Sequence, residues 1–209
     1  MTINDEHLTI NKIYMNAERL KSIIAFMDVT ERMKIIYRTV KVSTLDRGES
    51  DAEHSWHLAL LLMLLEKELP AEINILKLYK MLLIHDLVEV YAGDTSVYDT
   101  VGRLDKAERE AKAAETLFSQ LPSDLKEEFF ALFHEFEARE TLEANIAKAL
   151  DKLHPLMQNL SSEGTDYLEF SATYEDEKQR IKPYVDFHPT LAQMATVLLD
   201  EAKSRGYIE

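Results

Sequence analysis

The sequence of 209 residues contains no cysteine. This absence excludes disulfide bonds, zinc sites built on thiolates and cysteine nucleophiles. Histidine, aspartate and glutamate are therefore the strongest metal ligands that the chain can offer. The residues at the N-terminus do not resemble a secretory signal, and with the lack of cysteine this leads us to expect a cytoplasmic protein.

Glycine and proline are also scarce, with five of each in the chain. Such low usage argues against an all-β fold, which needs many tight turns. Long apolar runs are missing as well, because the longest one, Leu58 to Leu65, is far shorter than the roughly 20 residues of a membrane-spanning helix. We expect no membrane association.

Positive charge is the third shortage. The chain has 24 lysines and arginines against 38 aspartates and glutamates, a formal net charge of −14. A surface of this sign repels nucleic-acid backbones and anionic membranes. A nucleic-acid polymer is therefore excluded as an expected partner, and a small molecule is favoured.

The apolar residues recur mostly every three or four positions, which is the period of an amphipathic helix. The pattern predicts an all-α fold of eight or nine helices in a single domain, residues 1–209. Its core would lie at about 20–160, with the C-terminal helices 166–205 packed on it. The first helix would bury Ile13, Leu20, Ile23, Ile24 and Met27. The predicted helices cover residues 10–28, 30–36, 50–70, 74–92, 104–121, 123–139, 141–160, 166–184 and 189–205.

Two local signals locate the ends of central helices. Ser50 and Glu53 match the S-x-x-E capping box, in which each side chain accepts a backbone N–H of the first turn. This places His54 about one turn into its helix. Gly93 is suited to the C-terminal cap of the helix predicted at 74–92.

The main candidate for chemistry is a polar cluster within that apolar helix. His85, Asp86 and Glu89 are three or four residues apart and therefore lean toward one side of it. His54 lies on a neighbouring apolar helix, and Asp151 interrupts another. Two imidazoles and two carboxylates from three helices would form a mixed nitrogen and oxygen site, which suits Mn, Co, Fe, Ni or Zn better than calcium.

The order of these residues resembles the HD superfamily of metal-dependent phosphohydrolases, and within it the branch that contains the bacterial 5'-deoxynucleotidases. The likeness extends over about residues 20–160. It is carried by Ala52-Glu53-His54-Ser55-Trp56-His57, Leu83-Ile84-His85-Asp86-Leu87-Val88-Glu89 with Gly93-Asp94, and Ala147-Lys148-Ala149-Leu150-Asp151-Lys152.

The resemblance implies a role for each residue. The four metal ligands would be His54, His85, Asp86 and Asp151, holding one divalent transition metal ion, and the substrate would be a nucleoside 5'-monophosphate. It further implies that Glu89 is catalytic and that Asp94 helps hold both the substrate and the attacking water. Arg38 would contact the substrate, and the protein would form a homodimer. Thr39 follows Arg38 where these deoxynucleotidases carry a tryptophan, so the preference between deoxyribose and ribose stays open.

Two alternatives remain at this stage. The protein could act on another phosphorylated metabolite, such as a cyclic nucleotide, a guanosine polyphosphate or a deoxynucleoside triphosphate, or it could be a non-catalytic helical binding protein. Among other residues, we expect Trp56 in the core and His154 in a supporting role beside Asp151. The charged run around residues 106–115 is typical of a solvated helix face.

Overall fold

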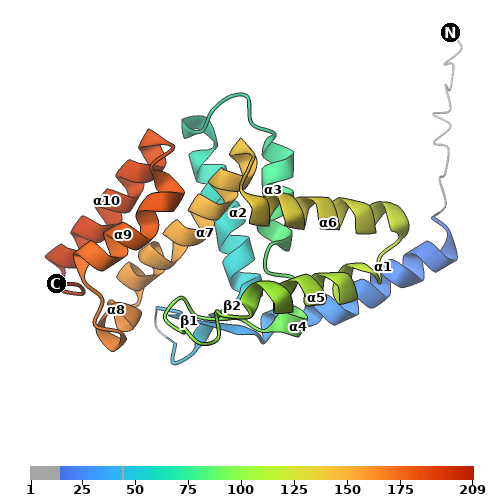
Figure 1. Ribbon diagram of the computed structural model, residues 1–209, viewed down its shortest axis with the longest axis horizontal. Helices are drawn as coiled ribbons and strands as arrows, with labels where there is room; N and C mark the ends of the chain where they lie inside the picture. The colour runs from blue at the N-terminus through green and yellow to red at the C-terminus, as the bar shows by residue number, and fades with distance from the viewer. Residues whose placement is uncertain (1–14, 44) are drawn as a thin grey trace, which may run out of the picture.

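The computed structural model describes residues 15–43 and 45–209. Within them it contains ten α-helical segments and one small two-stranded sheet, so the predicted all-α fold is confirmed. Two of the segments, α4 and α8, are only four and five residues long, which leaves eight longer helices. Figure 1 shows α2, α3 and α7 in the middle of the molecule, with α9 and α10 on one side and α1, α5 and α6 extending to the other.

The first helix, α1 (Ala17–Thr30), begins where the Asn16 side chain accepts the N–H of Glu18 at 2.8 Å, and the short 3₁₀ helix η1 (Glu31–Lys34) follows it. Only Phe26 of α1 is buried, against the ring of Phe129. The predicted burial is wrong for three residues, Ile23 is half-buried, and Ile13 lies outside the described residues. The exposed fractions are 46% for Leu20, 59% for Ile24 and 62% for Met27, because no described element covers that face.

The helix predicted at 30–36 is shortened to the 3₁₀ helix η1, and a hairpin follows in a stretch for which no strand was predicted. Strand β1 (Tyr37–Lys41) pairs antiparallel with β2 (Gly48–Ser50), with Tyr37 opposite Ser50. Gly48 permits this close approach, since a Cβ there would lie 2.0 Å from the carbonyl oxygen of Arg38. The hairpin leads directly into the next helix, α2 (Asp51–Leu65), which is followed by the 3₁₀ helix η2 (Glu66–Glu68).

The helix predicted at 74–92 is interrupted. Helix α3 (Ile75–Ile84) ends before His85, and the short α4 (Glu89–Ala92) begins after a four-residue turn. The turn is tighter than an α-helix because N–H groups bond to the carbonyl three residues back, as Glu89 does to Asp86 at 2.9 Å. Gly93 ends α4 with a φ of 73°, so the predicted cap is confirmed.

Three longer helices follow a loop at residues 93–105. They are α5 (Lys106–Phe118), α6 (Ser123–Ala138) and α7 (Leu142–Ser161). Helix α7 starts where the Thr141 hydroxyl accepts the N–H of Ala144 at 3.2 Å. The segment predicted as one helix at 166–184 is divided into α8 (Thr165–Glu169) and α9 (Tyr174–Val185), and α10 (Pro189–Ser204) begins with its predicted proline.

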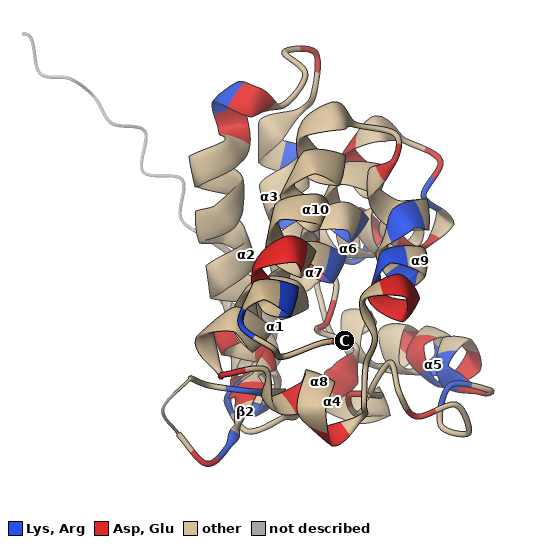
Figure 2. Ribbon diagram, turned by 90° about the vertical axis from the view of Figure 1, so that its left-hand side faces the viewer, with Lys and Arg blue, Asp and Glu red and all other residues tan. Residues whose placement is uncertain are grey.

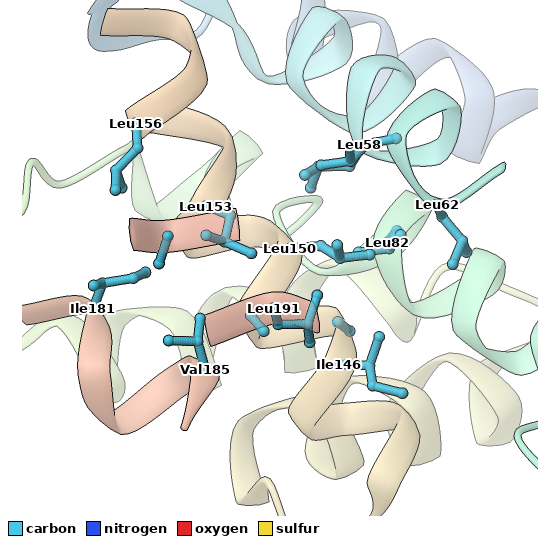
Figure 3. Close-up of a cluster of buried hydrophobic side chains, with 14 of the residues drawn as sticks. Leu58, Leu62, Leu82, Ile146, Leu150, Leu153, Leu156, Ile181, Val185 and Leu191 are labelled. Carbon is cyan, nitrogen blue, oxygen red and sulfur yellow. The ribbon is translucent and has the colours of Figure 1, made fainter. Parts of the chain in front are cut away.

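The larger of two hydrophobic clusters joins the central helices to the C-terminal ones, and the smaller cluster lies between α1, α5 and α6. Leu58 of α2 and Leu82 of α3 belong to the same buried cluster as Leu150 of α7, Ile181 of α9 and Leu191 of α10 (Figure 3). The C-terminal helices therefore pack on α7 and share its core. No described helix combines the length and the hydrophobicity needed to cross a bilayer.

Candidate metal and catalytic site

His54 is held at the first turn of α2 and is fully buried. The predicted capping box is present: the Ser50 hydroxyl accepts the N–H of Glu53 at 3.3 Å, and the Glu53 carboxylate accepts the N–H of Ser50 at 2.9 Å. This fixes where the helix starts and hence where the imidazole lies. His54 Nε2 is 3.3 Å from Asp151 Oδ1, while its Nδ1 is 3.1 Å from Nδ1 of His154.

The His85–Asp86 pair lies in the tight turn after α3. His85 Nδ1 is 3.0 Å from the carbonyl oxygen of Leu82, a suitable acceptor for an Nδ1–H. The other ring nitrogen, Nε2, is 3.0 Å from Asp86 Oδ2 and 3.8 Å from Asp151 Oδ1. The contact with Asp86 is short but does not have the direction of a hydrogen bond, so this buried nitrogen has no hydrogen-bond partner among the described residues. Such a nitrogen can bind a cation once it gives up its proton.

Asp151 comes from the middle of α7 and is 4% exposed. Its Oδ1 faces the two imidazoles of His54 and His85, and its Oδ2 lies 2.9 Å from Nζ of Lys152. Three separate helical segments thus bring side chains to one point, as the sequence predicts.

The donor set fits a divalent transition metal ion. One ligand atom each from His54, His85 and Asp151 lies within 4.8 Å of the other two. Asp86 Oδ2 adds a fourth donor at 3.9 Å from His54 Nε2. Two imidazole nitrogens with carboxylate oxygens are ligands that Mn, Fe, Co, Ni and Zn accept, whereas calcium prefers oxygen alone.

The protonation states of these groups follow from their mutual contacts. Burial acts to raise the pKa of Asp86 and Asp151, but the surrounding cations and hydrogen bonds, led by His85 for Asp86 and by Lys152 for Asp151, together outweigh it and lower both values. For His85, burial acts to lower the pKa, and the two carboxylates outweigh it and raise the pKa to about 9. In the metal-free protein His85 therefore carries a proton at neutral pH, and cation binding must displace it.

Arg38 projects from β1 into the same centre. Its Nη1 donates to Asp86 Oδ2 at 2.9 Å, and Nη2 lies 3.8 Å from Asp151 Oδ1. The guanidinium is desolvated, yet the carboxylates of Asp86 and Asp151 raise its pKa. A buried, permanently charged arginine beside the metal ligands is suited to hold a phosphate.

Glu89 stands one tight turn beyond Asp86 and is 2% exposed. The turn stacks residues three apart, so oxygens of Asp86, Glu89 and the fully buried Asp51 lie within 4.8 Å of one another. Burial and then the nearby charge of Asp86 raise the pKa of Glu89 well above its usual value. The same two causes raise the pKa of Asp51 to about 7. Glu89 is therefore a carboxyl group that can carry a proton at neutral pH.

A cavity of about 390 Å³ opens from these residues to solvent, and Asp94, which follows the Gly93 cap, lines it. Lys106 at the start of α5 also lines it, with Nζ 3.9 Å from Glu89 Oε1. In a protein with a net charge of −14, several cationic side chains gather on this cavity. They are Arg38, Arg103, Lys106, Arg139, Lys148 and Lys152.

The structure brings all seven of the residues selected from the sequence to one cavity or its buried floor: His54, His85, Asp86, Asp151, Glu89, Asp94 and Arg38. Other expectations are wrong. Trp56 is 64% exposed and does not belong to the core. The charged run of α5 is not a purely solvated face, because Lys106 is partly buried and Glu110 is only 9% exposed, both lining the cavity.

The sequence analysis missed Asp51 and Glu49 as neighbours of the site. Asp51 precedes His54 by three residues on α2, a spacing that could have suggested a shared helix face. Glu49 Oε2 lies 3.3 Å from Nδ1 of His54, where it can orient the ring. His154 also contacts this nitrogen, in line with its expected supporting role, and its Nε2 is 2.8 Å from Nδ1 of the partly exposed His57.

Comparisons with known proteins agree with this arrangement. The chain is 27% identical over 194 residues to the 5'-deoxynucleotidase HDDC2 of Xenopus laevis, covering 88% of this chain and 89% of that protein. It is 32% identical over 149 residues to the 5'-deoxynucleotidase hdd1 of Schizosaccharomyces pombe, covering 69% and 74% of the two chains.

A solved structure gives a closer match. The crystal structure of a predicted metal-dependent phosphohydrolase from Magnetospirillum magnetotacticum has a TM-score of 0.82 and 40% identity, and the match covers 91% of this chain and 96% of that one. The sequence model of the HD domain family matches residues 30–191, a span that contains every ligand candidate described above. This protein belongs to the HD domain family.

Proposed function

We propose that this protein hydrolyses nucleoside 5'-monophosphates, with 2'-deoxyribonucleotides as the main substrates, to nucleosides and phosphate. The protein is a metal-dependent phosphohydrolase of the HD type. The observation that carries the substrate proposal is the convergence of His54, His85, Asp86 and Asp151 beside a cavity whose lining includes both carboxylates and several cationic side chains that can meet a phosphate. The 5'-deoxynucleotidases among its relatives support the same substrate class.

We propose that His54, His85, Asp86 and Asp151 hold one divalent ion, which could be Mn, Co, Fe, Ni or Zn. When bound, such an ion supplies a Lewis acid that polarises a phosphoryl oxygen and lowers the pKa of a coordinated water. The buried Nε2 of His85 supports this assignment, because it lacks a hydrogen-bond partner among the described residues. His85 would release its proton on metal binding.

Arg38 would bind the phosphate through its guanidinium, which already lies 2.9 Å from a carboxylate of the ligand set. Lys106 faces Glu89 across the cavity and would add a second positive charge at the phosphate. Both cations belong to segments outside the central pair of helices α2 and α3, β1 for Arg38 and α5 for Lys106.

Glu89 would give its proton to the 5'-oxygen as the bond to phosphorus breaks. Burial and the nearby charge of Asp86 raise the pKa of this carboxyl group well above its usual value, which favours the protonated form that a general acid requires. Asp94, after the Gly93 turn, would accept a hydrogen bond from the attacking water and hold the sugar end of the substrate. Thr39 lines the cavity beside Arg38 and is placed to meet the sugar.

The chain would act as one helical domain, in the cytoplasm, and as a homodimer. The dimer is supported by α2, whose residues from Ser55 to Leu65 include no aspartate, glutamate, lysine or arginine. Figure 2 shows this helix almost free of charged positions along its length. Trp56, Met63 and Leu64 are 64%, 57% and 69% exposed, and a second copy would cover them.

The test is phosphate release from ribo- and deoxyribonucleoside 5'-monophosphates, 3'-monophosphates, cyclic nucleotides and triphosphates. Chelator-stripped protein is restored with Mn, Co, Mg or Zn, and an Asp86→Ala variant serves as the control. We expect metal-dependent release from 5'-monophosphates alone, absent in the variant. Phosphate release from triphosphates or cyclic nucleotides instead would show that the substrate is one of the other phosphorylated metabolites that HD phosphohydrolases cleave. Silence across the panel, without thermal stabilisation by metal, would support a non-catalytic protein.

A Glu89→Gln variant tests the proton donor separately. It should retain metal binding and lose about 100-fold or more in kcat, because glutamine cannot protonate the leaving oxygen. If the metal-loaded variant hydrolyses the substrate at the wild-type rate, Glu89 is not the proton donor.

A further inference from the structure

The cavity continues well beyond the metal ligands along one face of α7. Asp151, Pro155 and Asn159 all line it and are spaced four residues apart, so they follow one another on the same side of the helix. Eight residues of α-helix span about 12 Å. The cavity therefore has a second end, about as far from the metal ligands as the outer edge of a base lies from the phosphate in an extended nucleotide.

Asp166 lies at this second end. It belongs to α8, lines the cavity and is 2% exposed. Its backbone N–H donates to Asn159 Oδ1 at 3.2 Å, which ties it to the end of α7. Its own Oδ1 is buried without a hydrogen-bond partner in the described part of the chain. Leaving a buried carboxylate oxygen unbonded is costly, so a donor from a ligand is expected there.

The other walls at this end are mostly uncharged. Thr39 and the buried Val40 of β1 line the cavity, as do Pro155 on α7 and Tyr98 in the loop after α4. The Tyr98 ring stacks on Phe170 with ring centroids 4.1 Å apart, which fixes the loop against the segment after α8. Asp166 is therefore the charged group among these walls, beside the neutral polar side chains of Thr39, Tyr98 and Asn159, and a carboxylate placed in this way can read one edge of a ring.

We propose that Asp166 recognises the nucleobase of the substrate and favours guanine over thymine. The inference rests on the proposed nucleotidase function. An ionised carboxylate only accepts hydrogen bonds, and it offers two oxygens side by side. Guanine presents two adjacent donors, N1–H and the exocyclic amino group, and satisfies both oxygens. Thymine presents carbonyl oxygens on either side of its single N–H, and these would face the carboxylate.

The protonation state of Asp166 supports an assay at pH 8. Burial and the nearby charges of Glu169 and Glu177, opposed by Lys41, together raise its pKa to about 6. The carboxylate is thus ionised at pH 8 and becomes protonated below about pH 6. The preference for dGMP over dTMP should therefore decline as the pH falls from 8 to below 6. The rate of dTMP hydrolysis should follow a different pH profile.

The experiment compares kcat/KM for dGMP and dTMP in the metal-loaded wild type, in Asp166→Asn and in Glu169→Gln. Glu169 is an exposed carboxylate on the same short helix, so its variant is a matched loss of charge. The wild type should prefer dGMP by about tenfold or more, since a bidentate contact of this kind discriminates bases by that order. Asp166→Asn should abolish the preference by lowering the value for dGMP, and Glu169→Gln should retain it.

The ratio of the two substrates within one variant does not depend on how much of that protein is folded. A wild type without base preference, or an equal loss for both substrates in Asp166→Asn, would overturn the proposal. If the wild type hydrolyses no nucleotide, the proposed function fails instead. Titration of the metal-free proteins with deoxyguanosine then tests Asp166 alone: we expect binding by the wild type that Asp166→Asn loses, and no binding by either would overturn it.

Discussion

Replacing Asp51 by asparagine should make the metal-free protein more stable at pH 8 and change its stability little at pH 4. Asp51 is fully buried beside Asp86 and Glu89, and both of its oxygens lack hydrogen-bond partners among the described residues. Burial and the charge of Asp86 raise its pKa to about 7. Asparagine has nearly the same shape and no charge to bury.

The size of the effect follows from the pKa. The folded protein binds the Asp51 proton more tightly than the unfolded chain, whose aspartates titrate near 3.9. The stability that this proton contributes is complete below about pH 4 and is lost as the pH rises to about 7. A difference of about three units corresponds to about 4 kcal/mol in the free energy of unfolding. This is an upper limit, because Glu89 and Asp86 adjust their own protonation.

The assay is urea denaturation of chelator-treated wild type and Asp51→Asn at pH 4, 6 and 8. The difference between the two proteins removes the contribution of every shared group that does not interact with Asp51. Asp46→Asn is the control, since its side chain is 98% exposed and its loss alters only surface charge. A stability difference that stays the same from pH 4 to pH 8 would refute the reasoning.

Three further predictions concern the metal, the core and the dimer. Mn²⁺ at 100 times its dissociation constant should stabilise the wild type by about 3 kcal/mol and raise its melting temperature by roughly 5–10 °C. Asp151→Asn should show no such shift in differential scanning fluorimetry, and an equal shift would contradict its place among the ligands. Leu150→Ala removes a fully buried side chain and should cost about 2–5 kcal/mol in urea denaturation, whereas a cost below about 1 kcal/mol would show that α7 is not central. Met63→Glu should convert a dimer to a monomer in light scattering, while Leu168→Glu, at another exposed leucine, should not; a dimer in both would place the interface elsewhere.

Much of the site was predictable for two reasons. Helix capping follows local sequence motifs, and charged residues stand out in helices that are otherwise apolar. The capping box locates His54 from four residues of sequence. A histidine, two aspartates and a glutamate in otherwise apolar helices signal a shared centre, since such groups are not buried without a partner. The structure bears out the helical class and brings His85, Asp86 and Asp151 together as expected.

The errors arose where the outcome depends on distant parts of the chain. The apolar stripe of α1 has helical spacing, but spacing cannot say whether another element covers it, and Ile24 is 59% exposed. The prediction that Trp56 of α2 lies in the core was wrong for the same reason. Hairpin β1–β2 is too short to give a periodic signal and depends on the contact between Gly48 and Arg38.

The tight turn at His85 is a different case, because its residues have helical periodicity throughout. The change from four-residue to three-residue hydrogen bonding leaves no mark on the apolar pattern. Lys106 likewise sits in a run that has the composition of a solvated surface, and only the packing of α5 beside α4 brings it to the cavity.

The metal ligands and the distal cavity walls come from different parts of the architecture. The ligands sit on α2, the turn after α3 and α7, whose side chains also build the hydrophobic core. The walls that would meet the sugar and the base come from β1, the loop after α4 and the short α8. Sequence changes in these peripheral segments would alter which molecule fits while leaving the core intact. Evolution, or a protein engineer, can therefore exchange the substrate of this scaffold by replacing about three short segments, with the hydrolytic centre inherited unchanged.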